Sequence, residues 1–327
     1  MLRKLKSILF SILTRTNNFL LGTGIGKIPG LLVVYDRLFP LFWTEETILD
    51  VQGSKMYLNV RDKDPNMRKT FRAYALNRIH EESTTELFEK VVKDGDVVVD
   101  LGANIGYFTL LAAKLVGKNG EVYSFEPEPR NFSFLKKNIE LNDYKQVVAN
   151  QKAIAEGPGT VKLYICHYDT GHHTINQYGG ITAYRPDFTE DKKEFVEIEK
   201  VALDDFLKDK KQPVDVIKMD VEGAEMLALS GMDRILREGK NLKMFIEFFP
   251  LLIKEMGGSP DEFARRLLEE YHFSMFVIGE DYSMHDYVTN KKYLKINSVD
   301  ELMNLCKGEA DHVNLFLKKG EDIGSLF

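Results

Sequence analysis

The sequence predicts an α/β fold in which helices cover both faces of a doubly wound, mostly parallel sheet. One observation is a β-branched run, Val97–Val99, that leads into Asp100 and a loop with two glycines. Runs of this kind are typical of buried parallel strands. The other is the alternation that follows, an apolar helical stretch over 108–116 and then a second strand over 121–125. Alternating strands and helices indicate a parallel sheet with a helix after each strand.

The loop after the first strand indicates the class of ligand. Its pattern is D-x-G-x-x-x-G, formed by Asp100, Gly102 and Gly106, and it differs from the G-x-G-x-x-G of dinucleotide-binding proteins. An acid at the start of the loop suits a cationic ligand, and S-adenosylmethionine (SAM) carries a sulfonium and an ammonium group. Glu126 ends the second strand 20 positions after Gly106, where an acid can accept hydrogen bonds from both ribose hydroxyls. The pattern therefore predicts SAM.

The rest of the chain continues the alternation. Val51–Val60 is expected to form a strand or hairpin, and the capping-box pattern Ser83–Glu86 predicts a helix over 86–92. Later helices are expected over 129–141, over 224–236, and over 260–271 with Ser259 as N-cap. Further strands are expected over 147–155, 160–165, 195–201, 215–219, 243–248, 273–278 and 313–317.

Three segments follow from these patterns: a basic amphipathic segment over 1–45, a small lobe over 46–82, and the main domain over 83–327. Leucines and isoleucines recur at helical spacing near the N-terminus, and basic and polar residues lie between them. Two interpretations stay open: residues 1–43 contact a membrane surface, or this helix packs on the protein's own core. The apolar run is too short to span a bilayer. We expect a cytoplasmic protein, with peripheral contact at the inner face of the membrane under the first interpretation.

Composition restricts the partners. The formal net charge of −6 argues against nucleic acid as the main partner, since phosphate binding requires a basic surface. The two cysteines, Cys166 and Cys306, give neither a disulfide framework nor a C-x-x-C metal site. We expect the partner to be a small molecule, glycan or glycolipid, the last two because the N-terminal segment suggests a membrane surface.

Consecutive motifs over residues 83 to 250 resemble those of the FkbM family of SAM-dependent methyltransferases. They are Asp100–Gly106, Phe125–Asn131, Lys137–Asn142, Val201–Leu207, Ile217–Glu225 and Phe245–Glu247, with a weaker match at Asn314–Phe316. The resemblance implies a class I methyltransferase fold (Rossmann-like) with an antiparallel last strand and, usually, O-methylation. It also implies a cofactor site. The residues expected there are Asp100, Gly102, Ala103, Asn104, Gly106, Glu126, Pro127, Asn131, Ala153 and Asp220.

Three acids are the candidates for catalysis. Asp220 follows the fourth strand, Glu222 comes two residues later, and Glu247 closes the fifth. Methyl transfer to an alcohol requires an aligned acceptor and removal of its proton. The acids serve as a base, or they hold Mg²⁺ that lowers the pKa of the acceptor. Helix capping and ion pairing are the alternatives without a catalytic role.

The irregular loop over about 166–194 is expected to bind the acceptor. Three histidines lie in it, and His172 is a further candidate base; a solvated loop is the alternative. A base-modifying enzyme of nucleic acids would carry an N/D-P-P-Y/F/W segment after the fourth strand, where this chain has Asp220–Gly223. We therefore expect O-methylation of a sugar, glycan or glycolipid hydroxyl. A polyketide-like or other small secondary metabolite is the alternative acceptor, and a non-catalytic SAM-binding, membrane-associated module is the alternative function.

Overall fold

The computed structural model describes residues 47–59, 62, 67, 71, 74, 79–166, 173–175, 194–210, 212–279, 292–308 and 311–320. The chain forms two compact units, Met1–His80 and Glu81–Phe327. The N-terminal segment 1–43, His172 and most of the 166–194 loop lie outside the described residues. Within the described ranges, no helix is long and apolar enough to cross a bilayer.

The first unit contains a β-hairpin. Strands β1 (Thr47–Val51) and β2 (Ser54–Leu58) pair antiparallel, with Val51 opposite Ser54. Gln52 and Gly53 form the turn with φ of 52° and 80°, the left-handed conformation that two-residue hairpin turns require. The backbone N–H of Gly53 donates to Asp50 Oδ1 at 2.9 Å. The hairpin expected over Val51–Val60 is thus present but begins four residues earlier, because the turn lies at Gln52–Gly53.

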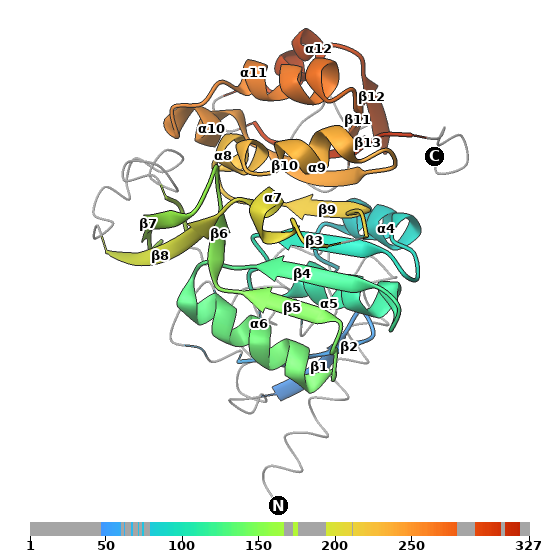
Figure 1. Ribbon diagram of the computed structural model, residues 1–327, viewed down its shortest axis with the longest axis vertical. Coiled ribbons are helices and arrows are strands. Elements are labelled where there is room, and N and C mark those ends of the chain that lie inside the picture. Colours follow the sequence, from blue (N-terminus) through green and yellow to red (C-terminus); the bar gives the residue numbers. More distant parts are fainter. Residues whose placement is uncertain are drawn as a thin grey trace, which may run out of the picture. The chain divides into compact units, whose positions relative to one another are not determined.

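The second unit is built on one eight-stranded sheet with the order β12-β11-β13-β10-β9-β3-β4-β5 (Figure 1). The five neighbouring strands β10, β9, β3, β4 and β5 run parallel. β13 lies between β10 and β11 and is antiparallel to both. This confirms the doubly wound sheet with an antiparallel last strand. The strands are β3 (Val97–Leu101), β4 (Glu121–Phe125), β5 (Val147–Asn150), β9 (Val216–Met219), β10 (Lys243–Phe248), β11 (Ser274–Ile278), β12 (Tyr293–Ile296) and β13 (Val313–Lys318).

The third predicted strand is wrong in its extent. Instead of one strand over 147–155, the chain forms β5 and then β6 (Lys152–Ile154), which leaves the central sheet after Gln151. β6 pairs parallel with β8 (Phe195–Val201), and β8 pairs antiparallel with β7 (Gly159–Tyr164). Figure 1 shows this three-stranded sheet at the side to which the arrowheads of the parallel strands point. The break occurs because β6 finds its hydrogen-bond partner in a strand far along the chain.

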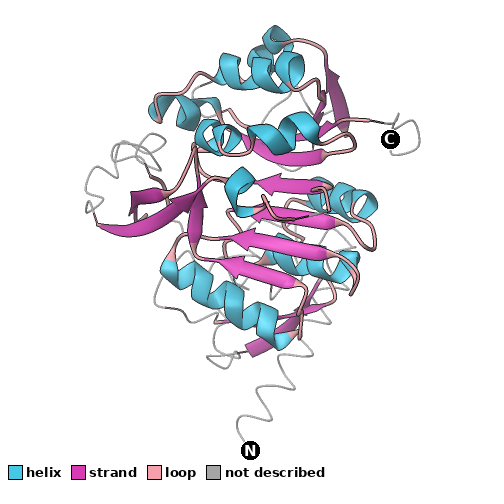
Figure 2. Cartoon of the chain, viewed as in Figure 1, coloured by secondary structure: helices cyan, strands magenta, loops and turns pink. Residues whose placement is uncertain are grey.

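Helices lie on both faces of the central sheet (Figure 2). Alternate side chains of β3 point to opposite faces of the sheet. Val97, Val99 and Leu101 belong to one core, which includes residues of the helices after β8, β9 and β10. On the other face, Phe88 of α4 (Glu82–Val91) contacts Phe108 of α5 (Tyr107–Val116) and Phe245 of β10, each at 5.3 Å between ring centroids. The remaining helices are α6 (Pro129–Leu141), α7 (Leu203–Phe206), α8 (Glu225–Ser230), α9 (Asp233–Glu238), α10 (Pro250–Glu255), α11 (Pro260–Arg265) with the π-helical turn η4 (Arg266–Glu270), and α12 (Val299–Leu305).

Two helix predictions need correction and one is confirmed. α4 begins at Glu82, so Ser83 is a buried residue of its first turn rather than a cap. The single helix expected over 224–236 is divided into α8 and α9 at Gly231, where a Cβ would lie 2.0 Å from the carbonyl oxygen of Ala155. That close packing fixes the break. Ser259 does cap α11, since its hydroxyl accepts the backbone N–H of Glu262 at 3.2 Å.

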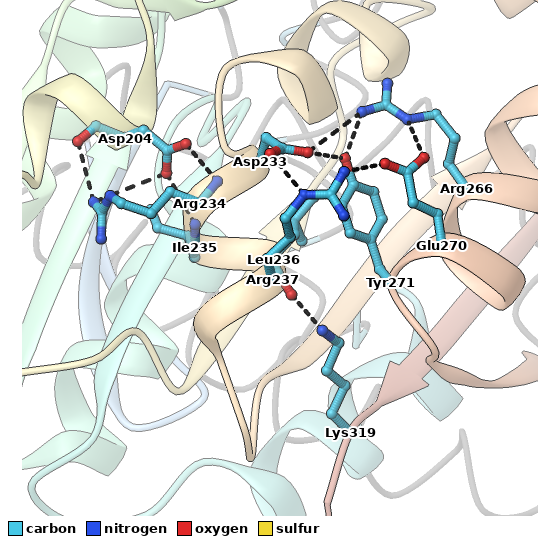
Figure 3. Close-up of polar contacts among 10 residues, drawn as sticks. All are labelled: Asp204, Asp233, Arg234, Ile235, Leu236, Arg237, Arg266, Glu270, Tyr271 and Lys319. Atoms are coloured by element: carbon cyan, nitrogen blue, oxygen red, sulfur yellow. Dashed lines mark hydrogen bonds and ion pairs between the residues drawn. The ribbon is translucent and has the colours of Figure 1, made fainter.

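A polar network links α9 to η4 and Tyr271 (Figure 3). It lies near the amino end of β10, since Ser274, three residues after Tyr271, pairs with Lys318, which also pairs with Lys243. The hydroxyl of Tyr271 donates to Asp233 Oδ1 at 2.8 Å, and Arg237 Nε donates to Asp233 Oδ2 at 2.8 Å. Arg266 also donates to the Tyr271 hydroxyl. Burial, and then the hydrogen bond to Asp233, raises the pKa of Tyr271 to about 12, so the phenol stays protonated at neutral pH. The network is structural, because it lies at the opposite end of the strands from the acids at their carboxyl ends.

The start of α9 depends on an acid from another helix, which gives a first prediction. Asp204 of α7 accepts the backbone N–H groups of Arg234 and Ile235 at 2.7 and 3.0 Å. Asp204→Ala should lower the free energy of unfolding by about 1–2 kcal/mol, the usual cost of losing such a cap. Urea unfolding measures it. Asp205→Ala is the control, since Asp205 is exposed, and it should change stability by less than about 0.5 kcal/mol. Equal effects of the two variants would contradict the capping role.

Candidate active site

Three carboxylates come together at the carboxyl edge of the parallel strands. Asp220 directly follows β9, and Glu247 is the second-last residue of the neighbouring strand β10. One carboxylate oxygen from each of Asp220, Glu222 and Glu247 lies within 4.8 Å of the others. Burial, and then the charges of Asp220 and Glu222, raises the pKa of Glu247 well above its usual value. Such a cluster can hold a proton or a cation at a fixed place.

A tight turn presents Glu222 to this cluster. Glu222 and Gly223 have φ of 51° and 95°, so both adopt the left-handed conformation. A Cβ at Gly223 would lie 2.9 Å from the carbonyl oxygen of Leu252 in α10, which leaves room only for glycine. Glu225, the next acid, is buried, and its Oε1 accepts the backbone N–H of Gly223 at 3.2 Å. Burial raises the pKa of Glu225 to about 8. Glu225 thus holds the turn from inside the protein.

A row of buried polar side chains crosses the sheet just below this edge. Ser124, Asp100 and Lys218 occupy the same register position on β4, β3 and β9. Thr109 of α5 bridges two of these residues. Its hydroxyl donates to Asp100 Oδ2 at 2.6 Å and lies 2.8 Å from the hydroxyl of Ser124. Burial raises the pKa of Asp100 to about 6. Asp100 is therefore placed inside β3, facing α5 and Lys218.

The glycine loop packs directly on the carboxylate cluster. Gly102 has φ of 81°, and a Cβ there would lie 1.8 Å from the carbonyl oxygen of Asp220. The backbone N–H groups of Gly102 and Ala103 donate to the carbonyl oxygen of Phe125 at 2.9 and 3.0 Å. Gly106, with φ of 101°, is the N-cap of α5. The loop is thus held between the ends of β4 and β9 and lies against Asp220.

Glu126 organises the other side of the loop. Its Oε2 accepts the backbone N–H of Asn104 at 2.7 Å, and its Oε1 accepts that of Glu128 at 2.8 Å. The side chain is buried, and this burial raises the pKa of Glu126 to about 8. Each carboxylate oxygen keeps a second lone pair for a further donor. A pair of ribose hydroxyls fits this remaining capacity.

An unsatisfied polar atom marks the same loop as a ligand site. Asn104 has φ of 50°, and its side-chain Oδ1 is buried without a hydrogen-bond partner among the described residues. Buried polar atoms normally have partners. A ligand with amino or hydroxyl donors would supply one here. The chemistry of Asn104, Glu126 and the neighbouring backbone therefore fits the nucleoside and amino-acid parts of SAM.

The other predicted cofactor residues lie around α6 and the small sheet. Pro127 follows Glu126 and is half-buried. Asn131 is buried in the first turn of α6, where its backbone N–H donates to Glu128 Oε2 at 2.6 Å. Ala153 lies in β6, opposite Lys200 of β8. Their contact with the cofactor stays a prediction. His172 is outside the described residues, whereas the neighbouring His173 accepts the backbone N–H of Cys166 through Nδ1 at 3.0 Å.

Sequence reasoning missed three residues of this site. Lys218 is buried within β9, 3.6 Å from Asp220 Oδ2 and 3.8 Å from Glu81 Oε2. A lysine inside an apolar strand was the available signal. Asn138 of α6 donates to the carbonyl oxygen of Ile105 at 2.9 Å and so holds the glycine loop. Glu81 gave no signal, because only the fold brings the residue before α4 to β9.

The chain matches a described protein family and several relatives. The family described as Methyltransferase FkbM domain matches residues 100–275, which is more than half of the chain. A protein of Beauveria bassiana called Methyltransferase 1 is 28% identical over 59% of this chain and 78% of its own length. The 31-O-demethyl-FK506 methyltransferase FkbM of Streptomyces tacrolimicus is 30% identical over 43% of this chain and 61% of its own length. A solved methyltransferase FkbM from Methylobacillus flagellatus shares 16% identity, with a TM-score of 0.35 over 78% of this chain and 55% of that one.

Proposed function

Since the chain belongs to the FkbM domain family of SAM-dependent methyltransferases, we propose that it transfers the methyl group of SAM to a hydroxyl oxygen of a small-molecule acceptor. One observation carries this proposal. The glycine loop and Asp220 are packed so closely that the carbonyl oxygen of Asp220 occupies the place of a Cβ at Gly102. The loop that fits SAM therefore adjoins the three carboxylates that can receive a proton.

The acceptor that we propose is a hydroxyl group of a sugar, glycan or glycolipid. The name of the Streptomyces tacrolimicus relative, 31-O-demethyl-FK506 methyltransferase, supports an oxygen acceptor. The net charge of −6 favours an acceptor other than nucleic acid. The basic N-terminal segment favours an acceptor held at a membrane surface. A polyketide-like metabolite is the second acceptor class to test, and the non-catalytic module is the alternative if no acceptor is methylated.

In the proposed reaction, separate residues bind SAM and receive the proton of the acceptor. Glu126 accepts hydrogen bonds from the ribose, and the loop over 102–106 holds the methionine part. When bound, SAM supplies an electrophilic methyl group on its sulfonium sulfur. The acceptor oxygen forms its bond to the methyl carbon as the carbon–sulfur bond breaks, and the hydroxyl proton passes to a carboxylate of the cluster. Glu247 is suited to keep that proton, because burial and the charges of Asp220 and Glu222 raise its pKa.

The same three acids could instead serve a metal. Asp220, Glu222 and Glu247 offer the oxygen ligands that Mg²⁺ prefers, and the ion would lower the pKa of the acceptor hydroxyl. Both forms of the reaction predict that Asp220 is needed for turnover. They differ in whether turnover depends on an added divalent cation.

Asp220→Asn tests the proposed function. The variant should bind SAM within about threefold of the wild-type affinity and lose at least about a hundredfold in methyl transfer, the usual contribution of a positioned base, because it removes either the base itself or the charge that raises the pKa of Glu247. Methyl-labelled SAM is incubated, with and without Mg²⁺, with a host extract split into lipid, polysaccharide and small-molecule fractions. Calorimetry measures SAM binding. Asp205→Asn, an exposed acid, is the control and should label as the wild type does. Full turnover by Asp220→Asn would contradict the proposal.

A further inference from the structure

Lys218 lies at the centre of the acidic site. It is 2% exposed, although lysine is rarely buried without a specific partner. Its Nζ lies 3.6 Å from Asp220 Oδ2, 3.8 Å from Glu81 Oε2, and 5.1 Å from the centroid of the Phe108 ring. These contacts come from three different elements: the segment after β9, the residue before α4, and α5. The amine is therefore enclosed at a fixed position.

Acids face Lys218 from four places: β3, β10, the segment after β9 and the residue before α4. Asp100 is its register neighbour on β3, and Glu81 precedes α4. On the side of the cluster, Asp220 and Glu247 both act on its charge. Burial would lower the pKa of Lys218, but these carboxylates together raise it above the usual value. The amine is thus a permanent positive charge among at least four carboxyl groups.

The backbone before α4 is arranged to bring Glu81 to this amine. Glu81 has φ of 45°, a left-handed conformation that is unfavourable for a residue with a side chain. Its carbonyl oxygen accepts the N–H of Thr85 at 2.7 Å, which starts the helix. The Glu81 side chain is 5% exposed, so its carboxylate faces the protein interior beside Lys218.

We propose that Lys218 is the built-in counter-ion of the Asp220–Glu222–Glu247 cluster, a positioning residue that supplies from inside the protein the positive charge that carboxylate clusters elsewhere take from a divalent metal. This proposal rests on the function proposed above and deepens it. A fixed ammonium group beside Asp220 offsets the repulsion among the three acids and holds the Asp220 carboxylate in place. It also lowers the affinity of the cluster for a second cation, since like charges repel. Methyl transfer by this chain should therefore require no divalent metal.

Lys218→Met is the test, and its readout needs neither SAM nor an acceptor. Without the amine, no positive charge offsets the repulsion among Asp220, Glu222 and Glu247. The three carboxyl groups of the variant should therefore bind Mg²⁺. Its melting temperature should then rise by roughly 3–6 °C in millimolar MgCl₂, compared with NaCl of the same ionic strength. The wild type should show no such rise. Lys208→Met, which removes an exposed lysine elsewhere, should also show none.

A second variant keeps the test decisive if Lys218→Met does not fold. Lys218→Met combined with Asp220→Asn removes both members of the ion pair between Lys218 and Asp220, so it should restore a folded protein that does not respond to Mg²⁺. Failure of the double variant to fold would overturn the proposal. So would a Mg²⁺-dependent rise in the melting temperature of the wild type equal to that of Lys218→Met. The test measures melting temperatures and not activity. If the variants show the expected Mg²⁺ responses but the wild type transfers no methyl group, the proposed function is contradicted and the role of Lys218 as counter-ion is not.

Discussion

Gly102→Ala should weaken SAM binding severely, and we expect it to be the most damaging single substitution at this site. The new Cβ would lie 1.8 Å from the carbonyl oxygen of Asp220, a backbone atom that can move only with the end of β9. The φ of 81° adds strain of about 1–2 kcal/mol for any residue with a side chain. We expect a loss of at least about 3 kcal/mol in the free energy of unfolding and at least a hundredfold weaker SAM binding.

Gly157→Ala is the matched control for this prediction. Gly157 has no atom within 4 Å of the position of a Cβ. The control should therefore change stability by less than about 0.5 kcal/mol and leave SAM binding intact. Thermal unfolding and calorimetry with SAM measure both quantities. If Gly102→Ala binds SAM as the wild type does, the loop does not depend on its contact with Asp220.

Glu126→Gln should have the next largest effect. Each oxygen of Glu126 accepts a backbone N–H, from Asn104 and from Glu128. In either orientation, a glutamine amide would turn an N–H₂ group toward one of these donors. The change should therefore weaken binding of SAM, and of adenosine as a probe of the ribose alone, by at least about a hundredfold. Glu140→Gln on the exposed side of α6 is the control and should bind both as the wild type does.

The same carboxyl group gives a pH dependence with a definite sign. Burial raises the pKa of Glu126 from 4.5 to about 8, so the group is largely protonated in the free protein below that pH. The ionised form accepts two hydrogen bonds from ribose hydroxyls, and therefore adenosine should bind more tightly as the pH rises through about 8. In the free protein, the contribution of this group to stability should fall between pH 4.5 and 8, because the folded state keeps a proton that the unfolded state loses. An adenosine affinity that does not change over this range would contradict the assignment.

The elements predicted with their correct bounds are those whose signals are local. β4 and β10 are short apolar runs between turn residues, and α6 begins at a proline that follows an acid able to cap it. The strand over 147–155 failed because its second half pairs with β8, and the helix over 224–236 failed because Gly231 packs on Ala155. Both corrections depend on contacts between residues distant in the chain.

The candidate site shows the same division. The positions of Asp220 and Glu247 at the ends of neighbouring parallel strands could be inferred from the sequence, and such ends meet at one edge of a sheet. Glu126 and Asn104 could likewise be placed near the cofactor loop. That Asp100 faces α5 and Thr109 could not be inferred, because the partner of a buried acid is set by the packing of the helix above it.

The sequence by itself determined the class of this protein: the strand, the glycine loop and the acids at strand ends, in this order along the chain, indicate a SAM-dependent methyltransferase, since each is a local pattern. Only the tertiary structure decided how the acids are balanced. Lys218, Asp100 and Glu81 come from three separate elements, and their distances depend on which strands are neighbours and which helix covers them. Electrostatic energies depend on distance and burial, and neither is encoded in the spacing of residues along the chain.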